Sequence, residues 1–328
     1  MAVTDWGRLT SITQSFVLPM VVHQLKKEMP FLGKLMAKAK KKSNGGTRIE
    51  VPVTYAFNTN GGSYSGLETL NTNQETTRTR AYYDWKQVYQ PIVIDNMEAF
   101  KNGVKMSSKE QVVDLLKQEM EEAKESIKNN LSTMVFGDGT GNGSKDLLGL
   151  KALVDDGTEV TSLGDITLAS YTWFNSSVSS TVGSLTLAHL ASQYVAASSG
   201  RDAEAVDLIV TTETVFNAYE ALNQPNIRWN DVTNGSTINP SGMKLMFRGA
   251  EVVADEYCPS GYMFGLNTRY MDFYVGDHPL HPTDKSGFTT TPLREPHDQD
   301  GQIGFILLYG QLIQKRPSRM FKSIGVTA

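Results

Sequence analysis

The most regular hydrophobic pattern of the chain lies between residues 107 and 136. Ser107 and Glu110 fit a capping box, in which each side chain satisfies a free backbone donor of the first helical turn. The glycines that begin at Gly137 end the pattern. At 1.5 Å per residue the predicted helix is about 43 Å long, well above the globular average of about 11–12 residues. Its apolar residues recur at the spacing of one helical face: Val112, Leu116, Met120, Ala123, Ile127, Leu131, Met134 and Val135.

The opposite face of this helix is charged and mainly acidic. A helix with one apolar stripe and one acidic face is typical of a support against which neighbouring elements or subunits pack. The residues of this face are Glu119, Glu121, Glu122, Lys124, Glu125 and Lys128.

Residues 47–95 carry the alternating pattern of β-strands in two stretches, 47–57 and 79–94. The segment between them is polar, rich in Gly, Asn and Thr, and longer than ordinary connections inside compact domains. Its few apolar residues, Tyr64, Leu67 and Leu70, cannot form a core of their own. We therefore expect a long two-stranded hairpin whose tip is ordered by contact with something else.

The remaining pattern mixes helices and strands, which predicts an α/β or α+β layer arrangement. An open loop rich in Asn, Ser, Thr and Gly is expected over residues 226–242. The continuous apolar run at 302–313 is typical of a central strand. The other predicted elements are helices at 187–197 and 212–222, and strands at 206–210, 244–247, 250–254, 261–266 and 271–275.

The first 48 residues hold nine Lys or Arg against two acids, nine minus two giving a net charge of +7. Short helices are predicted over 12–27 and 31–42. Such a charge run is usually a solvated face. The sharper hypothesis is that it docks on an acidic surface of another copy; binding of enclosed nucleic acid ranks third, because few aromatic residues interleave the charges. The docking hypothesis pairs Lys38, Lys40, Lys41 and Lys42 with Glu119, Glu121, Glu122 and Glu125.

Composition narrows the class of protein. The 328 residues are 40% hydrophobic and 20% charged, which allows a sizeable core in one or two domains. A net charge of −4 is too mild for a dedicated nucleic-acid or membrane binder. The single cysteine, Cys258, excludes an internal disulfide framework and suits a reducing compartment. No stretch resembles a signal peptide or reaches the roughly 20 apolar residues of a membrane span, so we expect a cytoplasmic protein.

Candidate chemistry is sparse. His278 and His281 have metal-like spacing, but the flanking prolines forbid a helix and favour a loop. Residues 138–143 resemble the front of a calcium loop, but Gly149 stands where the loop needs a Glu, which favours a turn. Cys258 is better interpreted as a small buried hydrophobe than as a nucleophile. With no nucleophile, base and orienting group in one locale, we predict no enzymatic activity and no cofactor.

The order of several short motifs resembles that of the major capsid proteins of tailed bacteriophages with the HK97-type fold. The resemblance spans almost the whole chain, and it is the order and spacing of the motifs that make it specific. The motifs are Tyr-Ser-Gly (64–66), Ala-Tyr-Tyr-Asp-Trp-Lys-Gln (81–87), Pro-Ile-Val-Ile (91–94), Lys-Asn-Gly (101–103), Phe-Gly-Asp-Gly-Thr (136–140), Gly-Leu (149–150), Tyr-Thr-Trp (171–173), Ile-Gly-Phe (303–305) and Lys-Arg-Pro-Ser-Arg (315–319).

The resemblance implies an α+β, HK97-like fold with four parts. They are an N-terminal arm at 1–46, an extended β-hairpin loop at 47–95, a peripheral domain at 96–155 and 285–328 that contains the spine helix, and an axial mixed α/β domain at 156–284. In such proteins the extended loop lies over a neighbouring subunit, which makes Tyr64, Leu67, Arg78 and Arg80 candidate inter-subunit residues. The chain starts at the arm, so we expect a fused scaffolding segment to be absent or already removed.

The function implied by the resemblance is structural. Many copies would assemble through pentamers and hexamers into an icosahedral head shell that encloses the phage genome. The implied partners are other copies, portal and scaffolding or decoration proteins, and packaged double-stranded DNA through non-specific contact, with no membrane. The implied location is the virion, after assembly in the host bacterial cytoplasm. Some relatives crosslink through a Lys in the extended loop; residues 49–85 hold none, so we expect no such crosslink.

Two alternatives remain open at the level of the sequence. An encapsulin-type nanocompartment shell protein would share the fold, but it would need an interior groove for cargo peptides. A soluble α/β hydrolase would need a convergent catalytic set, which the motifs do not supply.

Overall fold

The computed structural model describes residues 29–38, 40–42, 45–102, 115–198, 205–223, 245–284 and 287–327, and for Lys40–Lys42 the backbone alone. The predicted helix at 12–27, the capping box at 107–110 and the loop at 226–242 lie outside these residues. The described chain forms two compact units. Unit 1 contains Gln90–Ile127 and Thr291–Ile306, and unit 2 contains Lys27–Tyr89, Lys128–Thr290 and Leu307–Ala328.

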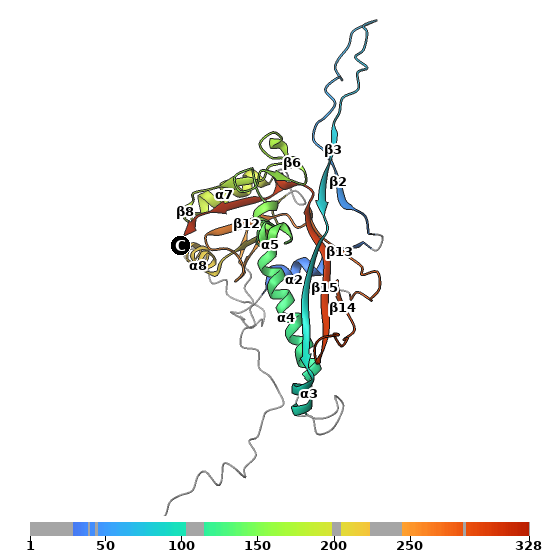
Figure 1. Ribbon diagram of the computed structural model, residues 1–328. Helices are drawn as coiled ribbons and strands as arrows, with labels where there is room; N and C mark the ends of the chain where they lie inside the picture. The colour runs from blue at the N-terminus through green and yellow to red at the C-terminus, as the bar shows by residue number, and fades with distance from the viewer. Residues whose placement is uncertain are drawn as a thin grey trace, which may run out of the picture. The chain divides into compact units, whose positions relative to one another are not determined.

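A six-stranded mixed sheet forms the centre of unit 2 (Figure 1). The pairs β9–β11 and β7–β16 are parallel, and the other neighbours are antiparallel. Strand β16 comes from much farther along the chain than the others, and it lies between β12 and β7. The order is β10 (Met246–Phe247), β11 (Ala250–Ala254), β9 (Leu208–Thr211), β12 (Tyr262–Leu266), β16 (Phe321–Ile324) and β7 (Ser177–Ser179).

Two helices pack on this sheet through apolar side chains. Helix α7 (Leu187–Ala197) matches the predicted bounds, and Thr186 caps it by accepting a 3.1 Å hydrogen bond from the His189 backbone N–H. Helix α8 (Glu213–Asn223) starts one residue later than predicted, since Thr212 precedes it. The buried cluster that they form with the sheet includes Leu190, Tyr194, Ile209, Val215, Tyr219, Val252, Met263 and Phe321.

A second sheet contains the long apolar strand β15 (Gly301–Gln314), which confirms the strand predicted at 302–313. Its order is β1 (Lys40–Lys42), β13 (Met271–Gly276), β15 and β14 (Phe288–Thr290), and β4 (Lys86–Asp95) also pairs with β15. The helix predicted over 31–42 is wrong beyond residue 37. Helix α2 (Pro30–Ala37) ends five residues earlier, and β1 then pairs in parallel with β13.

The long helix α4 (Leu115–Val135) follows α3 (Asn96–Asn102) in the chain. Its buried apolar residues repeat every fourth position, at Ala123, Ile127, Leu131 and Val135, as the apolar stripe predicted. The helix ends where the glycines begin. After the glycines the chain turns back and passes close to the end of the helix at Gly149, where only a residue without a side chain fits. A Cβ at Gly149 would lie 2.4 Å from the Met134 carbonyl oxygen, inside any real contact distance.

Short elements complete unit 2. Helix α2 is Pro30–Ala37, and β2 (Arg48–Thr54) pairs with β3 (Arg78–Asp84). The pairs β5–β6 and β8–β17 form two small ladders. The bounds are α5 Gly141–Ser144, α6 Leu150–Leu153, β5 Ser162–Leu163, β6 Ile166–Thr167, η1 Thr172–Phe174, β8 Gly183–Ser184, η5 Pro317–Arg319 and β17 Val326–Thr327.

The single strand predicted over 79–94 is in fact two strands divided at Trp85. Strand β3 pairs with β2, whereas β4 pairs with β15 in the other sheet. Both strands alternate at period two, so the pattern alone does not reveal the change of partner.

Across the described residues, no helix combines the length and apolar character that crossing a bilayer requires.

Candidate functional site

The extended hairpin of unit 2 is built on a regular antiparallel ladder. Arg48 lies opposite Asp84 and Thr54 lies opposite Arg78. Opposite charges face each other across it: the Arg80 guanidinium lies 3.0 Å from the Glu50 carboxylate, and Arg48 lies 2.8 Å from Asp84. Such cross-strand pairs each contribute roughly 0.2–1 kcal/mol. The ladder is therefore stabilised mainly by its backbone hydrogen bonds and by the apolar side chains on its buried face.

Beyond the ladder, residues 55–77 continue as two facing segments joined by side-chain hydrogen bonds. The Glu75 carboxylate accepts hydrogen bonds from both the backbone N–H and the hydroxyl of Thr59, at 2.8 and 2.9 Å. These two bonds lower the pKa of Glu75. Asn60 donates to the Asn73 carbonyl oxygen at 2.7 Å. Polar bonds between exposed groups hold the segment together because it has no core.

Large apolar side chains lie exposed along this same segment, which we call the hairpin tip (residues 55–77). Figure 1 shows it extending beyond the ends of β2 and β3, away from the sheets of unit 2. Water-exposed apolar side chains gathered on one projecting segment indicate a surface for another molecule. The exposed fractions are 91% for Phe57, 66% for Tyr64, 107% for Leu67 and 58% for Leu70.

Aromatic stacking fixes the base of the hairpin tip. The ring of Tyr55 stacks on Trp173, with centroids 5.2 Å apart, and Trp173 in turn packs edge-on against the buried Phe174. The backbone N–H of Tyr82 donates to the Gly164 carbonyl oxygen at 3.0 Å. The ladder is therefore anchored at one end, while the tip is left to project.

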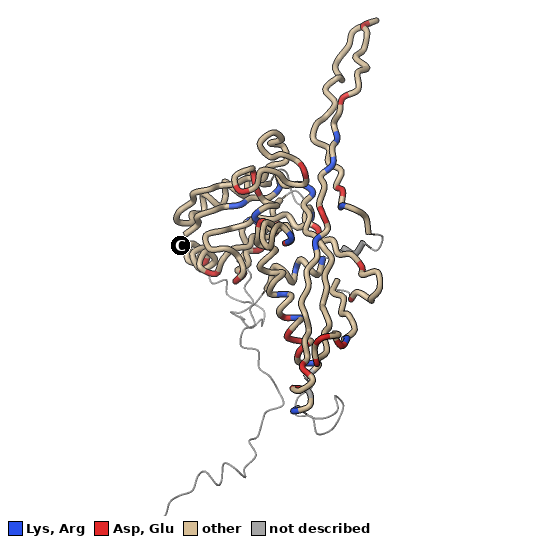
Figure 2. Tube along the Cα trace, viewed as in Figure 1, with Lys and Arg blue, Asp and Glu red and all other residues tan. Residues whose placement is uncertain are grey.

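The acidic face of α4 lies within unit 1. Glu121 and Glu122 are exposed, and Figure 2 shows acidic residues along this helix. Partial burial raises the pKa of Glu119, and the neighbouring charges of Glu122 and Glu98 add to the effect. Glu125 completes the predicted set. A cluster of like charges of this kind favours a cationic partner.

The predicted basic partners lie in unit 2. Lys38 follows α2, and its ammonium group donates to the Thr268 hydroxyl of the same chain. Lys40, Lys41 and Lys42 form β1, beside β13. The basic and acidic sets belong to different units, so their pairing stays a prediction.

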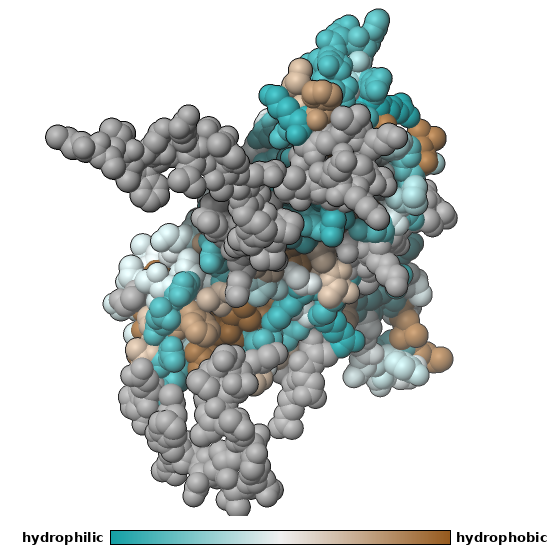
Figure 3. All heavy atoms as spheres, turned by 90° about the horizontal axis from the view of Figure 1, so that it is seen from below, coloured by the Kyte–Doolittle hydropathy of each residue, from teal (hydrophilic) through white to brown (hydrophobic). Residues whose placement is uncertain are grey.

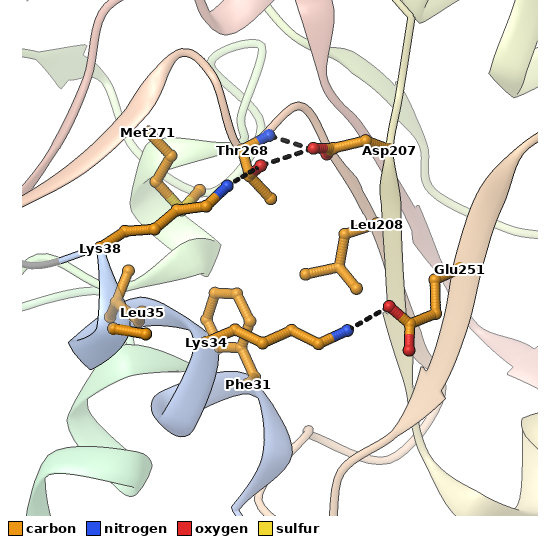
Figure 4. Close-up of a pocket in the computed structure, with 10 residues that line it drawn as sticks. Phe31, Lys34, Leu35, Lys38, Asp207, Leu208, Glu251, Thr268 and Met271 are labelled. Atoms are coloured by element: carbon orange, nitrogen blue, oxygen red, sulfur yellow. Dashed lines mark hydrogen bonds and ion pairs between the residues drawn. The ribbon is translucent and has the colours of Figure 1, made fainter. Parts of the chain in front are cut away.

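A cavity of about 300 Å³ between α2 and strands β9, β11 and β13 has no counterpart in the sequence analysis. Figure 4 shows its apolar walls and the charged groups at its rim, where the Lys34 ammonium lies 2.6 Å from the Glu251 carboxylate. The apolar walls come from Phe31, Leu35, Leu208 and Met271. Because these residues come from three separate segments, α2, β9 and β13, no local motif could have revealed the cavity.

Cys258 and His278, the candidate catalytic and metal residues, each make hydrogen bonds to nearby backbone groups. Burial raises the pKa of Cys258, whose thiol faces the Tyr262 carbonyl oxygen at 3.6 Å. The ring Nδ1 of His278 accepts hydrogen bonds from the backbone N–H groups of Leu280 and His281, so this histidine organises a loop. Among the described residues, no group of three or more His, Cys, Asp or Glu is placed to hold a metal ion.

Other exposed apolar side chains occur on both units. Val93, Met97 and Phe100 are exposed in unit 1, and Val195 and Met246 in unit 2. Figure 3 shows hydrophobic residues exposed among hydrophilic ones on the face seen from below. The hairpin tip is thus one of several surfaces suited to contact with other molecules.

Solved structures similar to this chain come from protein shells. A chain of the cyanophage A-1(L) capsid asymmetric unit is 14% identical with a TM-score of 0.70, covering 97% of this chain and 98% of that chain. The capsid of Myoviridae phage XM1 is 12% identical with a TM-score of 0.59, covering 95% and 96%. The holo-SrpI encapsulin complex from Synechococcus elongatus PCC 7942 is 10% identical with a TM-score of 0.59, covering 100% and 97%.

No protein-family model matches the chain, and no curated protein matches its sequence. At these identities the likeness establishes the fold. The chain therefore has the α+β, HK97-type fold of phage capsid proteins along nearly its whole length, which confirms the fold that the ordered motifs predicted.

Proposed function

We propose that the chain is the major capsid protein of a tailed bacteriophage. Many copies assemble through pentamers and hexamers into an icosahedral head shell that encloses the genome. The observation that carries the proposal is the hairpin tip, which presents four large apolar side chains to water on a projecting segment. Such a segment suits a subunit whose neighbours supply the missing contacts, and a shell fold spans the chain.

The parts of the chain take the following roles in this proposal. Residues 1–46 are an arm, 47–95 the extended loop, 96–155 and 285–328 the peripheral domain, and 156–284 the axial domain that meets its copies at capsomer centres. One detail bears on these limits: β16 lies in the six-stranded sheet beside β7 and β12, strands of the proposed axial domain.

The inter-subunit contacts proposed here combine apolar and ionic groups. Tyr64 and Leu67 of the hairpin tip bury against a neighbour, and Arg78 and Arg80 add charge at the base of the tip. The basic set Lys38, Lys40, Lys41 and Lys42 pairs with the acidic set Glu119, Glu121, Glu122 and Glu125 of another copy. Ring contacts between the axial domains are heterologous, so their angle determines closure of the rings and of the shell.

The role is structural and non-enzymatic. Further partners are portal and scaffolding or decoration proteins, together with packaged double-stranded DNA held by non-specific contact. Assembly takes place in the host bacterial cytoplasm, and the product is part of the virion.

Electron microscopy of the purified full chain tests the proposal. We expect rings or closed shells at micromolar concentration, with the hairpin tip lying on a neighbouring subunit in a reconstruction. A protein that stays monomeric over the whole concentration range, with the tip folded onto its own body, contradicts the proposal.

The second candidate is an encapsulin-type compartment, which the similarity to the holo-SrpI encapsulin supports. The two functions differ in contents and in vertex structure. Particles from the native host that hold nuclease-resistant DNA and one portal vertex support a phage head. Particles that hold a protein cargo behind twelve equivalent vertices support an encapsulin, since twelve five-fold positions follow from closed icosahedral symmetry.

A further inference from the structure

A completely buried lysine lies on β16, between β12 and the edge strand β7 of the six-stranded sheet. Lys322 is on β16, and its side chain has an exposed fraction of 0%. Its ammonium nitrogen Nζ lies 2.7 Å from Asp155 Oδ1, 2.8 Å from Glu159 Oε2 and 3.1 Å from the Lys151 carbonyl oxygen. Lysine is almost never fully buried unless it is paired, so two carboxylates around one amine call for an explanation.

The two oxygens of the Asp155 carboxyl group are held in different ways. Oδ2 accepts three backbone hydrogen bonds, from Gly157 at 3.1 Å, Glu159 at 3.0 Å and Val160 at 2.9 Å. Oδ1 faces the lysine nitrogen instead. The side chain of Asp155 is as fully buried as that of Lys322.

Glu159 is oriented by a third group. Its Oε1 accepts a 2.6 Å hydrogen bond from the Tyr262 hydroxyl, which leaves Oε2 directed at the lysine nitrogen. The ring of Tyr262 is itself covered by the Lys151 ammonium, 4.7 Å from its centroid. An amine, a carboxyl group and an oriented proton acceptor therefore meet in one buried place.

We propose that Lys322 and Asp155 join in an intramolecular isopeptide bond, with Glu159 carrying the protons. Glu159 accepts a proton from Nζ, and the freed electron pair of the nitrogen forms a bond to the Asp155 carboxyl carbon. The bond from that carbon to Oδ1 then breaks. Oδ1 leaves as water with two protons from the original ammonium group, both relayed by Glu159, which ends as the carboxylate it was. No oxidant or second reactant is needed.

Three features of the site favour this step. Nζ is already in contact with Oδ1, one bond from the carbon that it must attack. Little orientational entropy therefore remains to be lost on the way to the transition state. The three N–H groups around Oδ2 are placed to stabilise the negative charge that develops there in the tetrahedral intermediate. The product is a neutral amide, which replaces a buried ion pair whose desolvation is costly.

The bond would tie β16 to the turn that follows α6, positions 167 residues apart in the chain. It lies within one subunit, so it produces no ladder of crosslinked subunits in detergent gels. The inference stands on unit 2 alone and does not rest on the proposed function, since the mass of a denatured chain is independent of assembly.

Mass spectrometry of the freshly purified full chain tests the proposal. We expect a main species about 18 Da lighter than the sequence, because one water leaves when the amide forms. Trypsin should give a branched peptide that joins the Asp155 and Lys322 segments, with no cleavage after Lys322. A chain of full mass that is cleaved after Lys322 overturns the proposal.

Two variants separate the isopeptide bond from other losses of water, such as ring closure at the Asp156–Gly157 pair. Lys322→Met must restore the full mass; a variant that stays light places the lost water elsewhere and contradicts the proposal. Glu159→Gln keeps the side-chain volume but cannot accept the proton, so linkage should slow by roughly 100-fold or more. Linkage at the original rate removes Glu159 from the mechanism. The half-buried Lys34–Glu251 ion pair, at 2.6 Å, serves as an internal control that should stay unlinked.

Discussion

Replacement of Leu67 by serine is the sharpest probe of the hairpin tip. Leu67 lies in the turn after Gly66, and its side chain is fully exposed. Surface substitutions of this kind change the free energy of unfolding by about 0.5 kcal/mol or less. Full burial of a leucine against a neighbour is worth about 1.5–3 kcal/mol, and every 1.4 kcal/mol is about a factor of ten in concentration. Leu67→Ser should therefore raise the concentration needed for assembly by about 10- to 100-fold.

Light scattering against protein concentration measures the assembly threshold, and urea unfolding of unassembled protein measures the free energy of unfolding. Leu67→Met is the matched control, because a volume-conserving apolar exchange costs less than about 1.5 kcal/mol. The expected order of thresholds is wild type, then Leu67→Met, then Leu67→Ser. An unchanged threshold for Leu67→Ser would refute the view that the tip is buried between subunits. A large loss of monomer stability would show that the side chain packs on its own chain.

Four further predictions follow from the structure. Gly265→Ala should destabilise unit 2 by about 3 kcal/mol, because its Cβ would lie 1.9 Å from the buried Phe321 ring; urea unfolding measures the loss, and Phe321→Leu in the same chain should recover part of it. Glu at positions 40–42 in place of the three lysines should impair assembly more than folding, as judged by size exclusion and circular dichroism; normal shells would contradict the ionic pairing. Burial lowers the pKa of His189, so stability should be complete above the ordinary value of 6.5 and fall as the pH drops through the folded-state pKa, whereas His189→Gln should flatten this fall in acid unfolding curves. Boiled particles should give a single monomer band, since residues 49–85 lack lysine; a ladder would show another crosslink.

Elements with a strong local signal could be predicted from the sequence. Helix α7 has a threonine cap, an apolar face and matching bounds, and β11 and β15 are apolar runs between turn residues. The end of α4 was also predictable, because glycines follow it directly. In each case neighbouring residues of the chain contain the whole signal.

Elements that depend on distant partners could not be predicted in the same way. Strand β1 is a run of lysines that becomes a strand because β13 offers a parallel edge. The sequence of β16 is polar, because Lys322 and Ser323 follow Phe321. Its lysine is nevertheless buried against carboxylates that lie more than 160 residues away in the chain. The change of partner between β3 and β4 could not be predicted for the same reason. The strands on either side of Trp85 have the same alternating pattern, and the sheet that each one joins depends on its partner strand, β2 or β15.

The position of β16 also determines the order in which the sheet can form. Residues 321–324 fill the space between β12 and β7, so both of those strands are synthesised before the strand that joins them. A chain cut short before residue 321 would keep the open sheet edges that β16 covers, and open edges of this kind pair with other chains. Truncation ahead of β16 would therefore yield an aggregation-prone fragment in place of a subunit.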